Sequence, residues 1–292
     1  MAHELLLCGG PTRVPLAGGR VHEALLVRDG RIVAVGSARE VAEQAGPGAR
    51  RVALEGRCIL PAFADAHVHM SSFGALLGEV NLRDATSLAE ALRLIAEGAR
   101  QLGPREFLRG RGWDRNHWRD GQPTREALDA VVPSNPVVLP SHDGHSTWAN
   151  SAALRLAGIT RKTEAPAGGT IWRDAHGEPT GILSDAASGL VRSLIPEKTE
   201  TEVSEALKAG AAHALQHGVV ALRNCEGLRV HRLLLELVAA GEMPVAVASS
   251  VRPDDIEEAT EALAHQSSAD PVHIENVKIF AVSYTHLRAH ET

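Results

Sequence analysis

Two histidines near the start of the chain have the spacing and the setting of a metal site. His67 and His69 end the segment 60–69, which reads Leu-Pro-Ala-Phe-Ala-Asp-Ala-His-Val-His. In a β-strand the side chains at positions i and i+2 leave the same face, so both imidazoles can reach one ion, and Asp65 shares that face. Imidazole nitrogen is a common ligand of zinc. A bare His-x-His pattern is also typical of an exposed strand face, so its surroundings must decide between the two interpretations.

Lys278 is a second candidate, because it lies inside the apolar segment 277–281, Val-Lys-Ile-Phe-Ala. A central strand of a barrel is covered on both sides, and an unpaired buried ammonium is costly. A lysine in such a strand therefore needs a partner or a chemical role. The alternative is a lysine at the strand end whose ammonium extends into water.

His142 and His145 lie in a polar loop that precedes a predicted helix. Turn chemistry and helix capping explain Asp143, Gly144 and Asn150 in this region, but they leave His145 unexplained. The residues alone leave the role of His145 open.

A third pair, His213 and His217, has the i, i+4 spacing of a zinc-protease helix. That motif needs a glutamate general base at its second position, where this chain has Ala214. We interpret the pair as part of a helix surface.

The first 60 residues and the last 90 show different patterns. Strands are predicted at 4–8, 23–28, 31–36, 51–54 and 57–60, with a hairpin signal at Asp29-Gly30 and a helix over 37–44. After residue 199, helices are predicted at 201–216, 228–240 and 253–265, and strands at 218–222, 244–251 and 273–281. This alternation is the βαβ signature of a parallel sheet or barrel.

The region between these two parts is predicted to be an insertion or lid. Ser87 and Glu90 form a capping-box pattern at the start of one helix, and Asn150 begins another that Gly158 ends. The remainder of 104–198 is rich in Gly, Pro, Trp and Asp and is predicted to be irregular.

The composition of the chain excludes some classes of binding partner. The 292 residues carry 30 Lys and Arg against 36 Asp and Glu, a net charge of −6, so neither nucleic acid nor an anionic membrane is expected as a partner. The three cysteines are far apart and form neither a disulfide framework nor a thiolate metal site. With no signal-peptide pattern and no apolar run long enough to span a membrane, we expect a cytoplasmic protein. The 15 histidines beside only 3% aromatic residues point to metal or proton chemistry.

Several ordered motifs resemble one family, the amidohydrolase superfamily of metal-dependent hydrolases, in particular amidohydrolase family 3, the YtcJ-like proteins. The resemblance runs from about residue 4 to residue 281. It rests on residues 60–69, Gly112-Trp113-Asp114, Pro123-Thr124, His142-Asp143-Gly144-His145 with Asn150, Ala153-Leu154, Gly168-Gly169-Thr170-Ile171, residues 177–183 (Gly-Glu-Pro-Thr-Gly-Ile-Leu) and residues 277–281.

The resemblance implies a divalent metal, zinc in our expectation, as one or two ions. By resemblance His67 and His69 are metal ligands, and Lys278 is carboxylated by CO₂ and bridges two ions. Carboxylation turns a cation into a carboxylate that such ions accept.

The resemblance also implies residues at the substrate. His145 is implied near the substrate carbonyl, as a catalytic and substrate-binding residue, and Trp113 and Asp114 at the mouth of the pocket. A tryptophan in an insertion is more often simply part of a hydrophobic core.

The chain departs from the family pattern at four positions. Ala62 replaces a glycine, and Val220 and Asn224 replace the usual threonine and aspartate around strand two. Asp185 stands where the family commonly has glutamate, and its shorter side chain argues against a direct catalytic or ligand role for that position.

We therefore predict an α/β fold with a truncated metal-dependent (β/α)₈ TIM barrel, limited to strands one to four, over residues 61–281. An incomplete β-sandwich module is expected over 1–60, and a long insertion follows strand one over about 70–198. Residues 282–292 contain the single tyrosine, Tyr284, and resemble a translated sequencing adaptor, so we expect a non-native tail.

The function predicted from these residues is hydrolysis of an amide or other non-peptide C–N bond of a small molecule by metal-activated water. The family's ligands on strands five and six and its strand-eight aspartate lie beyond this segment, so we expect the chain itself to be inactive and to bind metal weakly. A homo-oligomer is an expectation for the full-length protein. The alternative is a non-catalytic ligand-binding or regulatory member of the barrel family.

Overall fold

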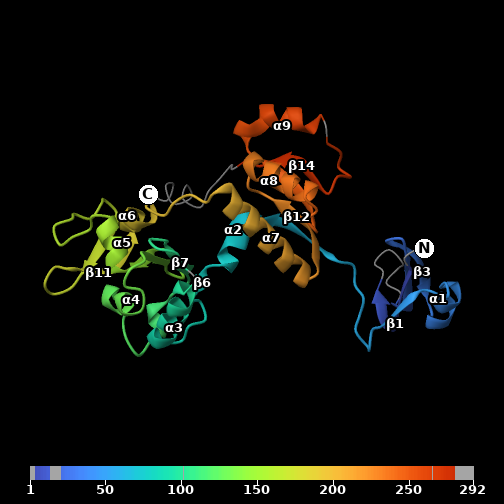
Figure 1. Cartoon of the computed structure of the whole chain (residues 1–292), viewed down its shortest axis with the longest axis horizontal. Helices are drawn as coiled ribbons and strands as arrows, with labels where there is room; N and C mark the ends of the chain where they lie inside the picture. Colours follow the sequence, from blue (N-terminus) through green and yellow to red (C-terminus); the bar gives the residue numbers. More distant parts are fainter. Residues whose placement is uncertain (1–3, 14–20, 101, 265, 280–292) are drawn as a thin grey trace, which may run out of the picture. The chain divides into compact units, whose positions relative to one another are not determined.

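The computed structural model describes residues 4–13, 21–100, 102–264 and 266–279 (Figure 1). They form two compact units. One contains the residues up to 64 together with 218–220, and the other contains 65–217 and the residues from 221 onward. The predicted tail, 282–292, lies outside the described residues.

The first unit contains one four-stranded sheet with a short helix packed on it. Its strands are β1 (Glu4–Arg13), β2 (Val21–Arg28), β3 (Arg31–Gly36) and β4 (Arg50–Ala53), in the order β3-β2-β1-β4. Helix α1 (Ala38–Gln44) begins with a complete capping box of Ser37 and Glu40. Leu6, Ala24, Leu26 and Val41 form the core between them.

An incomplete β-sandwich module was predicted for this unit, and its described residues form one four-stranded sheet, so the sandwich stays a prediction. The strand expected at 57–60 is reduced to one bridge between Thr12 and Ile59. The Asp29-Gly30 hairpin is confirmed, with positive φ at both residues, the geometry of the tight turn that suits strand twist.

The second unit carries the predicted alternation of helix and strand. Strands β5 (Phe63–Val68), β12 (Val219–Asn224), β13 (Ala246–Val251) and β14 (Val272–Val277) form a sheet in the order β14-β13-β12-β5. The pairs β12–β13 and β13–β14 are parallel. Phe63 donates to Gly218 and Cys225 to Val68, so β5 runs in the same direction. This parallel sheet fits part of a barrel.

The helices alternate with these strands as the sequence predicts. They are α7 (Glu200–Gln216), α8 (Leu228–Ala239) and α9 (Ile256–Leu263). Within the described residues, no helix combines the length and the apolar character that crossing a bilayer would require.

The insertion is more regular than predicted. It contains a six-stranded sheet, in the order β10-β11-β9-β8-β7-β6, formed by β6 (Val80–Asn81), β7 (Leu108–Arg111), β8 (Val137–Pro140), β9 (Ser146–Ala149), β10 (Gly169–Arg173) and β11 (Pro179–Asp185). Its helices are α2 (Met70–Leu77), α3 (Leu88–Ala99), α4 (Arg125–Val131), α5 (Ser151–Leu156) and α6 (Gly189–Arg192). The prediction of irregular structure over 104–198 was wrong, because most of these strands are too short to show a period in the sequence.

Helices α2 and α7 pack so closely that their backbones touch, and they lie side by side in Figure 1. A Cβ atom placed on Gly74 would lie 1.7 Å from the carbonyl oxygen of Ala206, and one on Gly210 would lie 3.1 Å from that of Met70. Only glycine permits this approach. The contact holds α2, which directly follows the His67–His69 segment, against the first long helix of the barrel.

Substitution Gly74→Ala should therefore destabilise the second unit strongly, because the added methyl group must displace backbone on α7. We expect a loss of about 3 kcal/mol in the free energy of unfolding, measured by urea denaturation. The control is Gly189→Ala, where a Cβ meets no atom within 4 Å and φ is −59°, so stability should stay the same or rise by about 0.5 kcal/mol. Equal stability of both variants would contradict the close packing.

Candidate metal centre

Three predicted residues meet at the carboxyl ends of the parallel strands. His67 lies in β5, His69 is one residue beyond its end, and Lys278 is one residue beyond the end of β14. Lys278 Nζ lies 3.0 Å from His67 Nε2, and the ring centroids of the two histidines are 5.6 Å apart. Carboxyl ends of barrel strands are where active sites of this architecture form.

The contact between His67 and Lys278 requires a curved sheet. Strands β5 and β14 are the outermost of the four, separated by three spacings of about 4.8 Å. Side chains stand roughly perpendicular to a sheet, so in a flat sheet these two would point in parallel and remain apart. Their approach shows that the two strands face one another across the concave side, as strands one and four of a barrel do.

A second set of contacts fixes the chain just after the histidines. Asn224 Oδ1 accepts a hydrogen bond from the amide of Met70 at 3.0 Å. Glu226 accepts from the amides of Ser71 and Ser72 at 2.7 and 2.9 Å and from both serine hydroxyls at 2.8 Å. The first turn of α2 is thus bound to the last residue of β12 and to the loop that follows it.

Only some of the side chains at this site are placed to bind a divalent ion. Two imidazoles on one strand are ligands that zinc accepts, but Asp65 Oδ1 instead accepts a hydrogen bond from the His67 amide at 2.9 Å. Among the described residues no three His, Cys, Asp or Glu side chains gather around one point. The residues that fit a metal here are His67 and His69, with Lys278 beside them as a group that carboxylation would make a ligand.

His145 lies in a separate cluster within the insertion. Its Nδ1 is 3.1 Å from Asp185 Oδ1, and the Asp185 amide donates to the His145 carbonyl at 2.7 Å. The His145 amide donates to Asp143, and this bond, after that from the Ser141 hydroxyl, holds the Asp143 pKa below its usual range. The His145 side chain meets Asp185, whereas His67 meets Lys278 and His69.

Trp113 and Asp114 border a small hollow in the same insertion. Trp113 is 3% exposed, its indole donates to the Leu139 carbonyl at 2.7 Å, and its ring packs on Trp118 and Trp148. Asp114 accepts from the Asn116 amide at 2.9 Å. The hollow, about 120 Å³, is also bordered by His142, Asp143 and Ser146. Trp113 is therefore a core residue whose edge reaches a cavity, and a role in substrate binding stays a prediction.

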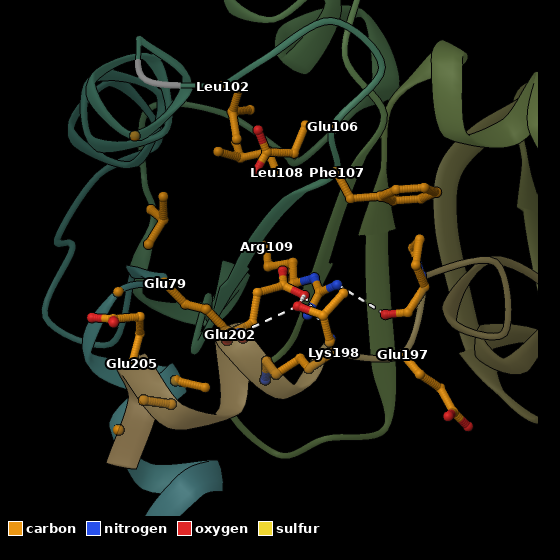
Figure 2. A pocket seen from close by; sticks show the side chains of 18 of the residues that line it. Glu79, Leu102, Glu106, Phe107, Leu108, Arg109, Glu197, Lys198, Glu202 and Glu205 are labelled. Carbon is orange, nitrogen blue, oxygen red and sulfur yellow. Dashed lines mark hydrogen bonds between the residues drawn. The ribbon is translucent and has the colours of Figure 1, made fainter. Parts of the chain in front are cut away.

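A cavity of about 580 Å³ lies beside the other end of α2, bounded by the insertion and the start of α7 (Figure 2). Glu79, Arg109, Lys198 and Glu202 line its charged part, and Phe107 belongs to its apolar lining. Burial raises the pKa of Glu79 above its usual value, while Lys198 and the nearby arginines oppose this. Neither candidate metal-binding histidine borders this cavity.

His231 is a buried titratable residue that sequence reasoning missed. It lies on α8 with 1% of its surface exposed, and its Nδ1 is 2.9 Å from Ser249 Oγ. Gln266 accepts from the Ile274 amide with its carbonyl, so its amide group donates to His231 Nε2 at 2.9 Å. The imidazole is thus held neutral, and burial, with smaller contributions from His273 and Arg232, lowers its pKa to about 4. Nothing in its spacing distinguishes it from an exposed histidine.

The pair His213 and His217 lies at the end of α7. Their ring centroids are 4.3 Å apart, His213 also packs its ring edge on Phe73, and His217 Nδ1 is 2.9 Å from the His213 carbonyl. Both histidines were predicted to lie on a helix surface. His217 is exposed as predicted, whereas His213 is half-buried.

A curved parallel sheet with two histidines at the end of its first strand and a lysine just after its fourth is typical of the barrels of metal-dependent hydrolases. The chain belongs to the amidohydrolase family, whose family model matches residues 50–290. This confirms the family resemblance of the sequence motifs.

Known relatives cover the chain only in part. It is 37% identical to the putative amidohydrolase YtcJ of Bacillus subtilis, over 69% of this chain and 38% of the relative. It is also 37% identical to N-substituted formamide deformylase of Arthrobacter pascens, over 65% of this chain and 36% of the relative. The chain thus spans little more than a third of the length of these relatives.

A solved structure shares the fold. An uncharacterized metal-dependent hydrolase from Pyrococcus furiosus superposes on 94% of this chain and 55% of its own, with a TM-score of 0.66 and 24% identity. At this identity the likeness establishes the fold.

His231 should make the second unit less stable in mild acid. The unfolded chain takes up a proton near pH 6.5, whereas the folded imidazole does so near pH 4. Stability is therefore complete above about pH 6.5 and falls by up to about 3 kcal/mol as the pH approaches 4. Urea unfolding between pH 7.5 and about 4.5 measures this. Substitution His231→Gln should flatten the pH dependence, whereas His176→Gln on an exposed turn should leave it. An unchanged slope in His231→Gln would contradict the prediction.

Proposed function

We propose that this chain supplies the first part of the active site of a metal-dependent hydrolase that cleaves an amide or other non-peptide C–N bond of a small molecule. The observation that carries the proposal is the 3.0 Å approach of Lys278 Nζ to His67 Nε2 at the carboxyl ends of two strands that are not neighbours. A structural lysine at an exposed strand end would have no reason to reach across the sheet to a histidine.

Each residue has a defined part in this proposal. His67 and His69 present ring nitrogens as neutral ligands, for which zinc is the best match. As an ammonium, Lys278 donates to the His67 lone pair that a metal needs. Reaction of its neutral amine with CO₂ releases a proton and forms an N–C bond, and the resulting carbamate offers oxygen ligands in place of a competing cation.

When bound, a divalent ion there would lower the pKa of a water toward neutrality and polarise the substrate carbonyl. The chain's own contribution from the insertion is His145. Because Asp185 engages Nδ1, the ring atom left to meet a substrate is Nε2, which can hydrogen-bond to a carbonyl oxygen. Trp113 and Asp114 would shape the entrance beside it.

The choice of a C–N bond rests on the relatives. One of them is named for removing the formyl group of N-substituted formamides, and it is matched over 65% of this chain. The supporting observation in the chain itself is the His-x-His and lysine arrangement. We also propose that the 292-residue chain alone is inactive, because the ligands and the base that the family places on strands five to eight are not among its motifs.

Hydrolysis of N-substituted formamides and other small amides tests the function. The gene recovered from its source DNA, read beyond codon 281, should encode a zinc-dependent hydrolase, and His67→Asn in that protein should lower kcat/KM by at least about a thousandfold. The 292-residue chain with added zinc should show no turnover. Turnover by that chain would overturn its proposed inactivity, and ligand binding without turnover by the longer protein would favour the non-catalytic alternative.

Carboxylation of Lys278 is tested separately. With zinc and ¹³C-bicarbonate, the chain should show one protein-bound carbamate signal by NMR, because metal coordination stabilises the carbamate. Lys278→Ala should remove it, whereas Lys162→Ala, on an exposed turn, should keep it. A signal that survives Lys278→Ala would assign the modification to another lysine.

A further inference from the structure

The first turn of α2 obtains its hydrogen-bond acceptors from another part of the chain. A helix begins with amide groups that lack partners inside the helix, and the residue at the N-cap commonly satisfies one with its own side chain. Here the N-cap is His69, and its side chain makes no capping hydrogen bond. The amides of Met70, Ser71 and Ser72 bind Asn224 and Glu226 instead.

Position 69 is both the N-cap of α2 and a candidate metal ligand, and here other residues provide the cap. A serine or aspartate at the N-cap would turn its oxygen back to the helix. His69 has no such bond, and its exposed imidazole remains available on the strand face that it shares with His67. Three amide hydrogen bonds of 2.7–3.0 Å, to Asn224 at the end of β12 and Glu226 in the loop after it, fulfil the capping role in its place.

We propose that Asn224 and Glu226 are positioning residues of the candidate metal centre: by capping α2 from the neighbouring strand, they fix the turn between β5 and α2 and hence the directions of His67 and His69. This inference rests on the proposed metal site and adds to it residues that no motif of the sequence assigns. Asn224 is 1% exposed, so its bond to Met70 is sheltered from water. Glu226 is also a negative group at the positive end of a helix.

The two residues act at different points of the turn. Asn224 holds Met70, the first residue of α2 and the neighbour of His69. Glu226 uses both carboxylate oxygens: Oε2 binds the Ser71 amide, and Oε1 binds the Ser71 hydroxyl and both groups of Ser72. A glutamine at 226 would keep one acceptor oxygen and lose the other. Partial function of Glu226→Gln is therefore expected.

The test uses cobalt(II) titration of the full chain, followed by its visible absorption, together with NMR of the imidazole nitrogens in the metal-free protein. Glu226→Ala should weaken cobalt binding about tenfold and shift and broaden the His67 and His69 signals, with Glu226→Gln between it and the unsubstituted chain. The control is Glu90→Ala, which removes a carboxylate that binds the Thr86 amide and hydroxyl before α3. It should leave cobalt binding and both signals unchanged.

The outcomes distinguish this inference from the function on which it rests. Unchanged imidazole signals and unchanged cobalt affinity in both Glu226 variants would overturn the positioning role. Equal losses in Glu90→Ala and Glu226→Ala would also overturn it, because they would reflect general destabilisation. If the unsubstituted chain binds no cobalt, the proposed metal site fails, and the imidazole signals still decide whether Glu226 positions the histidines.

Discussion

The rest of the second unit depends on how helix α2 is held. Its first turn is bound by Asn224 and Glu226, and its middle touches the backbone of α7 at Gly74. With eight residues, α2 is too short to be stable by itself, so these tertiary contacts define its direction. Helix α2 is the first helix of the insertion and directly follows the strand with the candidate metal ligands. One short helix therefore defines both the direction of the histidines and the start of the insertion.

The parallel sheet supplies the second constraint. Parallel pairing brings all carboxyl ends to one edge, and curvature then turns separated strands toward one another. This is why residues 211 positions apart, His67 and Lys278, approach to 3.0 Å. The outer face of the sheet is occupied by different chemistry: Ser249 of β13 meets the neutral His231 of α8. Buried histidine on the helix side serves structure, while exposed histidine at the strand ends remains available to a ligand.

The sequence predicts the elements that have a local period or a turn motif, and it misses those that depend on contacts between distant residues. Alternation after residue 199, the Asp29-Gly30 turn and the strand position of His67 follow from local periods and turn chemistry. The sheet of the insertion has strands of two to seven residues, held by a buried cluster of Trp113, Trp118 and Trp148. Such strands are defined by tertiary packing, so the sequence shows no regular alternation of apolar and polar residues along them. The cap of α2 was missed for the same reason, since its donors and acceptors lie more than 150 residues apart.

The candidate site residues lie in two places: His145 in the insertion, and His67, His69 and Lys278 at the strand ends. A barrel shared by many enzymes fixes where a metal lies, whereas side chains from loops select the substrate. Asp185 illustrates this. Its φ of 50° with ψ of −124° is strained for a residue with a side chain, and strain of this kind persists only where surrounding contacts maintain it. Two of these contacts are with His145, one through the backbone and one through the side chain. The strained backbone thus brings the Asp185 carboxylate into reach of the imidazole, and this contact fixes the orientation of the His145 ring.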